Sequence, residues 1–251
     1  KVEVDQNDVT RVNMGINHFD FNWNLKENES FQTPEIIMVY SSDGINGMSQ
    51  TFHNIFNNNI IRGKYKNRSR SVLINNWEAT YFDFDEEKIL SLARKAKALG
   101  VEMFVLDDGW FGTRNDDFQG LGDWYVNMEK LPNGISGLSK KINDLGMKFG
   151  LWFEPEMANK NSDLYRAHPD WILSAPGRYD TSSRNQHVLD FSRSEVVDYI
   201  YESVSKILRD ANIEYIKWDM NRCMTEVFSH TKESKNQKEV AHRYILGLSN
   251  C

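Results

Sequence analysis

Short apolar runs alternate with amphipathic stretches along the chain from residue 71 onward. The apolar runs have the length of buried β-strands and lie at residues 71–75, 101–106, 147–153, 187–191 and 213–218. Helical patterns occupy residues 85–99, 135–145, 162–167, 194–210 and 238–248. Asp85 suits a helix N-cap and Gly100 suits a helix stop, which fixes the ends of the first helix. The alternation predicts an α/β fold built from parallel βα units.

Two common folds use such units, the (β/α)8 barrel and the doubly wound sheet. Polar or aromatic residues follow each predicted strand, which is where barrel enzymes carry their active sites. No GxGxxG motif follows the first strand, so a dinucleotide-binding doubly wound sheet is disfavoured. We therefore expect a TIM-type (β/α)8 barrel. Five strands are fewer than eight, so the chain would hold only the N-terminal part of it.

The first 70 residues have a different pattern. Residues 19–23 alternate between apolar and polar, and residues 35–40 form an apolar run typical of a buried strand. Residues 57–59 and 62–70 are polar and predict loop and linker. We expect residues 1–70 to be the tail of a β-sandwich domain with its linker, and residues 71–251 to be the truncated barrel.

Composition excludes several function classes. The net charge is -6 and no basic run occurs, which argues against nucleic acid as a partner. No stretch approaches the roughly 20 apolar residues of a membrane span, so no membrane partner is expected. Two cysteines are too few for a disulfide framework and favour the cytoplasm. Neither CxxC nor HExxH is present, so we expect no metal and no cofactor.

Carboxylates and tryptophans gather where the predicted strands end. Asp107 and Asp108 follow the second run, Trp152 and Glu154 close the third, and Asp190 closes the fourth. Carboxylates accept hydrogen bonds from sugar hydroxyls, and indole faces stack on sugar rings. This combination favours a carbohydrate site, while metal ligation by the two aspartates would require further ligands that the sequence does not supply.

The last run ends in Lys217, Asp219 and Asn221, which share one face of a strand because side chains alternate. A cation beside a carboxylate favours its charged form. A carboxylate nucleophile needs that form at neutral pH. A salt-bridged strand end without catalytic function is the alternative that these three residues leave open.

Three blocks resemble a known family. Residues 106–112, 150–157 and 217–222 are similar to the signature blocks of the α-galactosidases of glycoside hydrolase family 36. The resemblance covers nearly the whole chain. Residues 15–23 and 31–35 look like the end of that family's N-terminal β-supersandwich, and residues 71–248 look like the first part of its catalytic barrel. Three long blocks in the correct order are far more specific than one short motif.

The resemblance implies a role for each strand-end residue. Asp219 matches the nucleophile of a retaining hydrolase. The residues that match the substrate-binding positions are Asp107 and Asp108 for the galactose hydroxyls, Lys217 and Asn221 beside the nucleophile, Trp77 and Trp152 as aromatic walls, and Arg184 in the pocket lining. Core packing is the alternative for both tryptophans, and a solvated loop position is the alternative for Arg184.

No residue matches the family's general acid. A retaining glycosidase needs a second carboxyl group about 5–5.5 Å from the nucleophile. In this family it follows the sixth strand, so we expect it beyond residue 251. Glu154 and Glu156 are the nearby substitutes, but their block belongs to the supporting shell of the pocket in this family.

The resemblance also implies what the whole protein would do. We expect a cytoplasmic bacterial α-galactosidase that releases terminal α-1,6-linked galactose from melibiose- or raffinose-type oligosaccharides and forms a homo-oligomer. An α-N-acetylgalactosaminidase or a galactosyl-transferring relative is the alternative within the family. The alternative of another class is a catalytically silent fragment that only binds sugar.

Overall fold

The computed structural model describes residues 1–251 and divides into two compact units, Lys1–Ser71 and Val72–Cys251. The first unit begins with an antiparallel hairpin of β1 (Val2–Val4) and β2 (Thr10–Val12). An irregular stretch leads to the helix α1 (Gly44–Ile55), which continues into the π-helix η1 (Phe56–Ile60) and the 3-10 turn η2 (Gly63–Tyr65). None of residues 1–71 is buried, so this unit has no core of its own.

The structure differs from the sequence prediction in this unit. Residues 19–23 and 35–40 form no strand, and Ile36, Ile37 and Met38 are exposed. A strand needs a neighbour to pair its backbone groups, and this unit pairs only β1 with β2. Residues 57–59, which we expected to be a loop, belong to η1.

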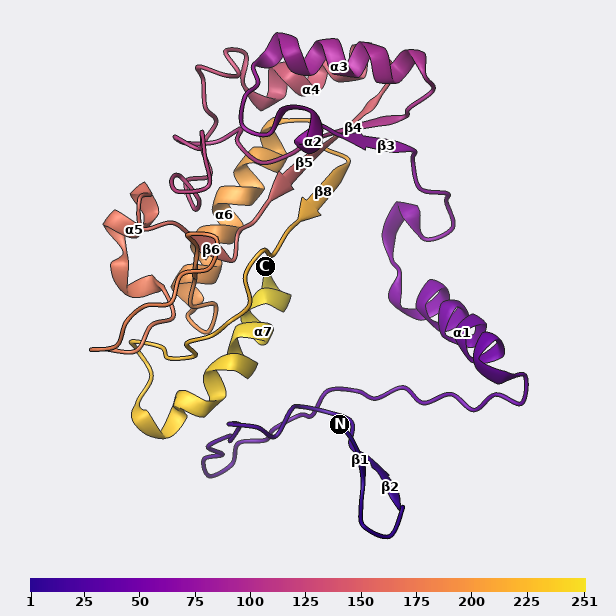
Figure 1. The fold of residues 1–251 in the computed structure, drawn as a ribbon, viewed down its shortest axis with the longest axis vertical. Coiled ribbons are helices and arrows are strands. Elements are labelled where there is room, and N and C mark those ends of the chain that lie inside the picture. The colour runs from indigo at the N-terminus through magenta and orange to yellow at the C-terminus, as the bar shows by residue number, and fades with distance from the viewer. The chain divides into compact units, whose positions relative to one another are not determined.

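The second unit is built on a parallel sheet of four strands (Figure 1). They are β3 (Leu73–Asn75), β4 (Met103–Leu106), β5 (Lys148–Phe153) and β8 (Tyr215–Trp218), in the order β3-β4-β5-β8. The strand order follows the chain order. Because crossovers between parallel strands are right-handed, such an order places all crossover helices on one face of the sheet. This is how a barrel begins, whereas a doubly wound sheet has helices on both faces.

The connecting helices largely match their predicted positions. They are α2 (Trp77–Thr80), α3 (Glu86–Ala98), α4 (Gly134–Asp144), α5 (Asp163–Ala167), α6 (Ser194–Asp210) and, after the 3-10 helix η4 (Ser234–Glu239), α7 (Val240–Asn250). Asp85 caps α3 as predicted, since its carboxylate accepts a 2.8 Å hydrogen bond from the backbone N–H of Lys88. Gly100 follows α3 with a φ of +86°, the left-handed conformation expected of a stop residue.

One predicted strand does not belong to the sheet. Residues 187–191 contain β7 (His187–Val188), which pairs antiparallel with β6 (Met157–Ala158) in a separate two-stranded sheet. The strand β8 pairs directly with β5, so the parallel sheet has four strands where we expected five. The apolar run at residues 187–191 is buried as a strand of the barrel would be, but hydrophobicity alone does not determine which sheet a short run joins.

An aromatic core packs near the carboxyl end of β5. Trp110 and Trp124 pack against Phe153, and Phe111 stacks on Trp152 with 6.1 Å between ring centroids. All five are buried. The 3-10 turn η3 (Pro169–Trp171) adds the buried Trp171 to the same hydrophobic core. Four of the seven tryptophans in this chain, Trp110, Trp124, Trp152 and Trp171, therefore serve core packing.

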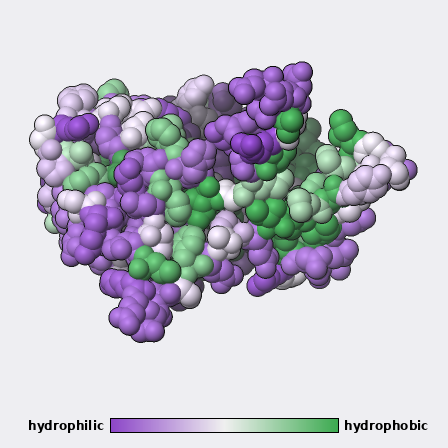
Figure 2. Space-filling model, turned by 90° about the horizontal axis from the view of Figure 1, so that it is seen from below, coloured by the Kyte–Doolittle hydropathy of each residue, from purple (hydrophilic) through white to green (hydrophobic).

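The surface of the molecule mixes hydrophobic and hydrophilic residues (Figure 2). The two edge strands of the parallel sheet contribute large exposed apolar side chains, namely Leu73, Ile74, Ile216 and Trp218. None of the helices combines the length and apolar character needed to cross a bilayer.

Candidate active site

The predicted site residues meet where the parallel strands end. Asp107 and Asp108 directly follow β4, and Asp219 directly follows β8. Between them lies β5, whose Trp152 is in register with Lys217 of β8. Parallel strands present their carboxyl ends at one edge of the sheet, so residues more than a hundred positions apart come together there.

Lys217 links the two carboxylates on either side of β5. Its Nζ atom lies 2.9 Å from an oxygen of Asp107 and 3.9 Å from an oxygen of Asp219. Asp107 also accepts a hydrogen bond from the side-chain amide of Asn75, at the end of β3. The backbone N–H of Asp107 donates to Asn76 at 2.8 Å. The Asp107 carboxylate is therefore fixed from two strands before any ligand binds.

Asp219 is placed as a reactive carboxylate would be. Its side chain is 31% exposed, while its backbone N–H donates to the carbonyl of Phe153 at 2.8 Å. The indole N–H of Trp152 donates to the carboxylate at 3.0 Å. Burial alone would raise the pKa of Asp219, but the hydrogen bonds from Trp152 and Asn221 and the charge of Lys217 outweigh it and lower the pKa. The carboxylate is thus ionised at neutral pH and partly open to solvent.

Asp108 is buried and paired with Arg114. The guanidinium Nε lies 3.0 Å from one carboxylate oxygen and Nη2 lies 2.9 Å from the other. Burial raises the pKa of Asp108, and the ion pair with Arg114 opposes that rise. Asp107 and Asp108 each face a cation of the protein, Lys217 and Arg114 respectively, and no group of three or more His, Cys, Asp or Glu side chains is arranged to hold a metal ion.

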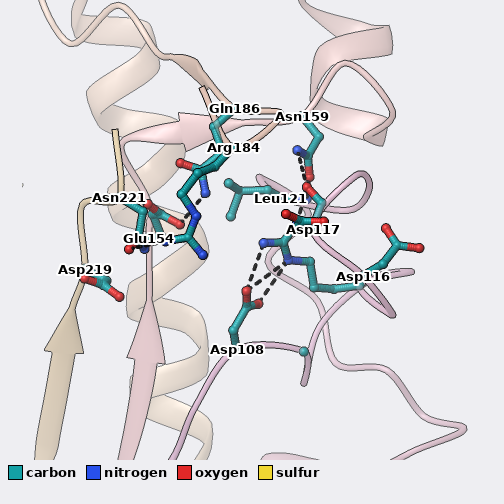
Figure 3. Close-up of polar contacts among 12 residues, drawn as sticks. Asp108, Asp116, Asp117, Leu121, Glu154, Asn159, Arg184, Gln186, Asp219 and Asn221 are labelled. Carbon is teal, nitrogen blue, oxygen red and sulfur yellow. Dashed lines mark hydrogen bonds and ion pairs between the residues drawn. The ribbon is translucent and has the colours of Figure 1, made fainter. Parts of the chain in front are cut away.

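Arg184 reaches the site from the loop before β7. Its Nη1 donates to the side-chain oxygen of Asn221 at 2.6 Å, while the backbone N–H of Asn221 donates to Glu154 at 2.6 Å. Figure 3 shows Arg184, Asn221 and Glu154 grouped together, with Asp219 to the left of this group and Asp108 at the lower centre of the view. Arg184 is therefore directed toward the nucleophile candidate despite its exposed loop position.

Glu154 and Glu156 are buried and occupied by protein partners. Glu154 accepts from Gln186 at 2.8 Å in addition to Asn221. Burial raises the pKa of Glu154 to about 7, against the hydrogen bonds from Asn221 that lower it. A pKa near 7 suits a general acid, but Glu154 is 0% exposed and so cannot reach a leaving group. Glu156 accepts from Trp218 at 2.8 Å and from the Tyr244 hydroxyl.

The two tryptophans that we expected to be aromatic walls lie at different depths, Trp152 buried and Trp77 half-buried, and their role in binding stays a prediction. Trp152 is only 2% exposed and stacks on Phe111, so its contribution to the site is the hydrogen bond to Asp219 rather than a free face. Trp77 lies on α2 with its ring edge-on to Phe82. Its backbone N–H donates to Asn75, the residue that also holds Asp107, which links Trp77 to the site through its main chain.

Two buried residues of the site, Arg114 and Asn159, were not predicted from the sequence. Arg114 lies in the long loop after β4, and Asn159 lies just after β6; both are buried and polar. A cation six residues after two adjacent aspartates was a signal that could have indicated the Asp108–Arg114 pair. Asn159 gave no such signal, because its partners lie far from it in the sequence.

Known proteins give independent information on this arrangement. The family model described as melibiase matches residues 30–251. The chain is 58% identical to the α-galactosidase AgaA of Geobacillus stearothermophilus over 248 residues, which cover 99% of this chain and 34% of that protein. It is 52% identical to the α-galactosidase Mel36A of Lactobacillus acidophilus, covering 98% of this chain and 34% of that protein. The chain therefore spans about a third of the length of these relatives.

Solved structures agree with the sequence matches. The crystal structure of AgaA, described as a GH36 α-galactosidase, superposes with a TM-score of 0.96 over 99% of this chain and 35% of that chain. The galactosidase domain of the α-galactosidase–sucrose kinase AgaSK gives a TM-score of 0.91 at 45% identity, over 99% of this chain and 34% of that chain. The family match and the two relatives show that the chain belongs to the melibiase family of glycoside hydrolases.

Proposed function

We propose that this chain provides the nucleophile half of a retaining α-galactosidase. The observation that carries the proposal is Asp219, an ionised and partly exposed carboxylate fixed by Trp152 and Lys217 at the end of β8. A retaining glycosidase needs such a group to attack the anomeric carbon. The bond from that carbon to the leaving oxygen then breaks, and a covalent glycosyl-enzyme forms.

The first step also requires an acid. The leaving oxygen takes a proton from a carboxylic acid, which afterwards removes a proton from the water that attacks the glycosyl-enzyme. Glu154 is enclosed and Glu156 is held by Trp218 and Tyr244, so neither serves. We assign the acid to a part of the protein outside these 251 residues.

The substrate is a terminal α-linked galactose. Asp107, Lys217 and Arg184 supply charged hydrogen-bonding groups around Asp219, and charged groups make the stronger hydrogen bonds to hydroxyls. Variants of AgaA have been solved with raffinose and with stachyose, which supports oligosaccharides of this type as substrates here. The relatives are named α-galactosidases, which favours galactoside hydrolysis over the N-acetylgalactosaminidase and transferase alternatives.

The proposal is tested by removing the nucleophile. Asp219→Ala in the full-length protein should abolish hydrolysis of raffinose, and added azide should restore turnover with formation of a β-galactosyl azide. Azide fills the space of the lost carboxylate and attacks the same carbon from the same side. Asp163→Ala, at an exposed carboxylate on α5, is a matched control that should keep full activity. Normal turnover by Asp219→Ala would refute the assignment.

A further inference from the structure

Asn159 forms a complete set of hydrogen bonds in the interior of the protein. The side chain is 0% exposed. Its Oδ1 accepts from Nη1 of Arg114 at 3.0 Å and from the backbone N–H of Leu121 at 2.9 Å. Its Nδ2 donates to the carbonyl of Asn185 at 2.8 Å and to that of Asp117 at 3.3 Å. A carboxamide offers two donors and two acceptor positions, so every one of them is used.

One side of Asn159 leads to Asp108. Arg114 is 1% exposed and binds both oxygens of the Asp108 carboxylate through Nε and Nη2. The remaining guanidinium nitrogen, Nη1, donates to Asn159 and to the carbonyl of Gln119 at 3.1 Å. The planar guanidinium is thus held in a single orientation. Because that orientation sets the direction of the Asp108 oxygens, Asn159 acts on Asp108 through Arg114.

The other side of Asn159 leads to Arg184. Arg184 and Asn185 both have left-handed backbone conformations, with φ of +52° and +60°. The N–H of Gln186 donates to the carbonyl of Ser183 at 3.0 Å, which closes a two-residue turn around them. Asn tolerates this conformation, but Arg does not favour it. Strain of this kind persists only where neighbouring contacts enforce it, and it gathers at functional sites.

Four side-chain contacts hold the strained turn. Asn159 binds the carbonyl of Asn185 from inside the protein, and Arg184 binds Asn221 beside the nucleophile candidate. At the end of the turn, the Gln186 side chain donates to Glu154 at 2.8 Å and the Gln186 carbonyl accepts from Arg222. Of these contacts, the one from Asn159 is made to the residue next to Arg184, so Asn159 helps to direct Arg184 into the site.

We propose that Asn159 is a positioning residue that couples Asp108 and Arg184, so that the two sides of the sugar pocket are set by one buried amide. The proposal rests on the α-galactosidase function proposed above. Asn159 itself does not touch the sugar. Its effect is on the binding of galactose in the ground state and the transition state alike, because under the proposed function Asp108 binds sugar hydroxyls, Arg184 lines the pocket, and neither residue reacts.

Asn159→Asp is the sharpest perturbation, because it keeps the size of the side chain. It replaces the two donors by an oxygen that faces the carbonyls of Asn185 and Asp117. It also places a carboxylate next to Arg114, where it competes with Asp108. A variant that weakens binding of the substrate and of the transition state equally has a higher KM and a nearly unchanged kcat. We expect KM for p-nitrophenyl α-galactoside to rise about 10–100-fold, by analogy with the loss seen when residues that orient metal ligands are replaced.

The experiment compares four forms of the full-length protein. They are the unmodified enzyme, Asn159→Asp, Arg184→Ala and the double variant. If Asn159 positions Arg184, the KM increase caused by Arg184→Ala is at least threefold smaller in the Asn159→Asp background. Asn161→Asp, at an exposed asparagine two residues away, is the control and should leave KM and kcat unchanged. A purely structural role would lower thermal stability without changing KM.

The outcomes separate the two proposals. An unmodified enzyme that does not hydrolyse α-galactosides overturns the proposed function. An active enzyme in which Asn159→Asp changes KM less than twofold, or in which the effects of Asn159→Asp and Arg184→Ala multiply independently, overturns the positioning role. If Asn159→Asp does not fold, the cycle of Arg114→Lys with Arg184→Ala measures the same coupling across an intact Asn159. Independent effects there also overturn the proposal.

Discussion

Replacing Glu154 by glutamine should change how the stability of the protein depends on pH. Glu154 is 0% exposed, and burial raises its pKa from the ordinary value of 4.5 to about 7. The hydrogen bonds from Asn221 lower this pKa, and the nearby charges of Asp219 and Asp108 raise it. In the unfolded chain the carboxyl group has its ordinary pKa. Folding therefore favours the protonated form of Glu154.

The size of the effect follows from the difference between the two pKa values. A raised carboxyl pKa leaves stability intact below pH 4.5, where both states are protonated, and reduces it as pH rises toward 7. Above pH 7 the loss is complete. The difference between 4.5 and about 7, at 1.36 kcal/mol per pKa unit, corresponds to about 3 kcal/mol.

Glu154→Gln keeps the shape of the protonated side chain and removes the charge. The variant can still accept from the backbone N–H of Asn221, and its new amide can donate to Gln186, whose side-chain oxygen is buried without a partner. That pairing requires only a rotation of the Gln186 amide. We expect Glu154→Gln to be as stable as the unmodified protein at pH 4.5 and more stable by about 3 kcal/mol at pH 8.

Urea unfolding at several pH values between 4.5 and 8 measures this difference. Glu87→Gln removes an exposed carboxylate from α3 and is the control. Its free energy of unfolding should depend on pH as that of the unmodified protein does. Turnover by Glu154→Gln should stay within about tenfold of normal, because loss of a true general acid costs about 10²–10⁴-fold. Parallel stability curves for Glu154→Gln and the unmodified protein would refute the reasoning about the buried carboxyl group.

Two further predictions concern metal and the isolated chain. Activity of the full-length protein should survive exhaustive EDTA treatment because Asp107 and Asp108 are paired with Lys217 and Arg114; loss that a divalent ion restores would contradict this. The isolated 251-residue chain should hydrolyse p-nitrophenyl α-galactoside at least about 10²-fold more slowly than the whole enzyme, and light scattering should show oligomers through the open edges of β3 and β8. A monomeric, fully active chain would contradict both expectations.

The main fold could be predicted because each parallel strand carries its own local signal. The runs that became β4 and β5 are mostly apolar, and the residues that begin and end α3, Asp85 and Gly100, can be recognised in the sequence. The run at residues 187–191 misled us because burial is common to barrel strands and to the short β6–β7 pair. The helix α1 was missed although Ile45, Met48, Phe52 and Ile55 recur at the spacing of one helix face.

The sequence predicted those residues of the candidate site that lie at the carboxyl ends of the parallel strands. Asp107, Asp108, Lys217 and Asp219 come together because parallel strands align their carboxyl ends. Asn159 could not be found in this way. Its partners lie from 26 to 45 residues away, and only the folded loops bring them to one amide.

The central claim is that Asp219 forms a covalent bond with galactose. The full-length protein is incubated with a 2-fluoro-α-galactosyl substrate that has a reactive leaving group. The fluorine slows both the formation and the hydrolysis of the glycosyl-enzyme, and the reactive leaving group speeds only its formation, so the glycosyl-enzyme accumulates. Mass spectrometry of the digested protein then locates the label. The account predicts one fluorogalactosyl group, carried by the peptide that contains Asp219 and absent after Asp219→Ala. A label on another residue would contradict it.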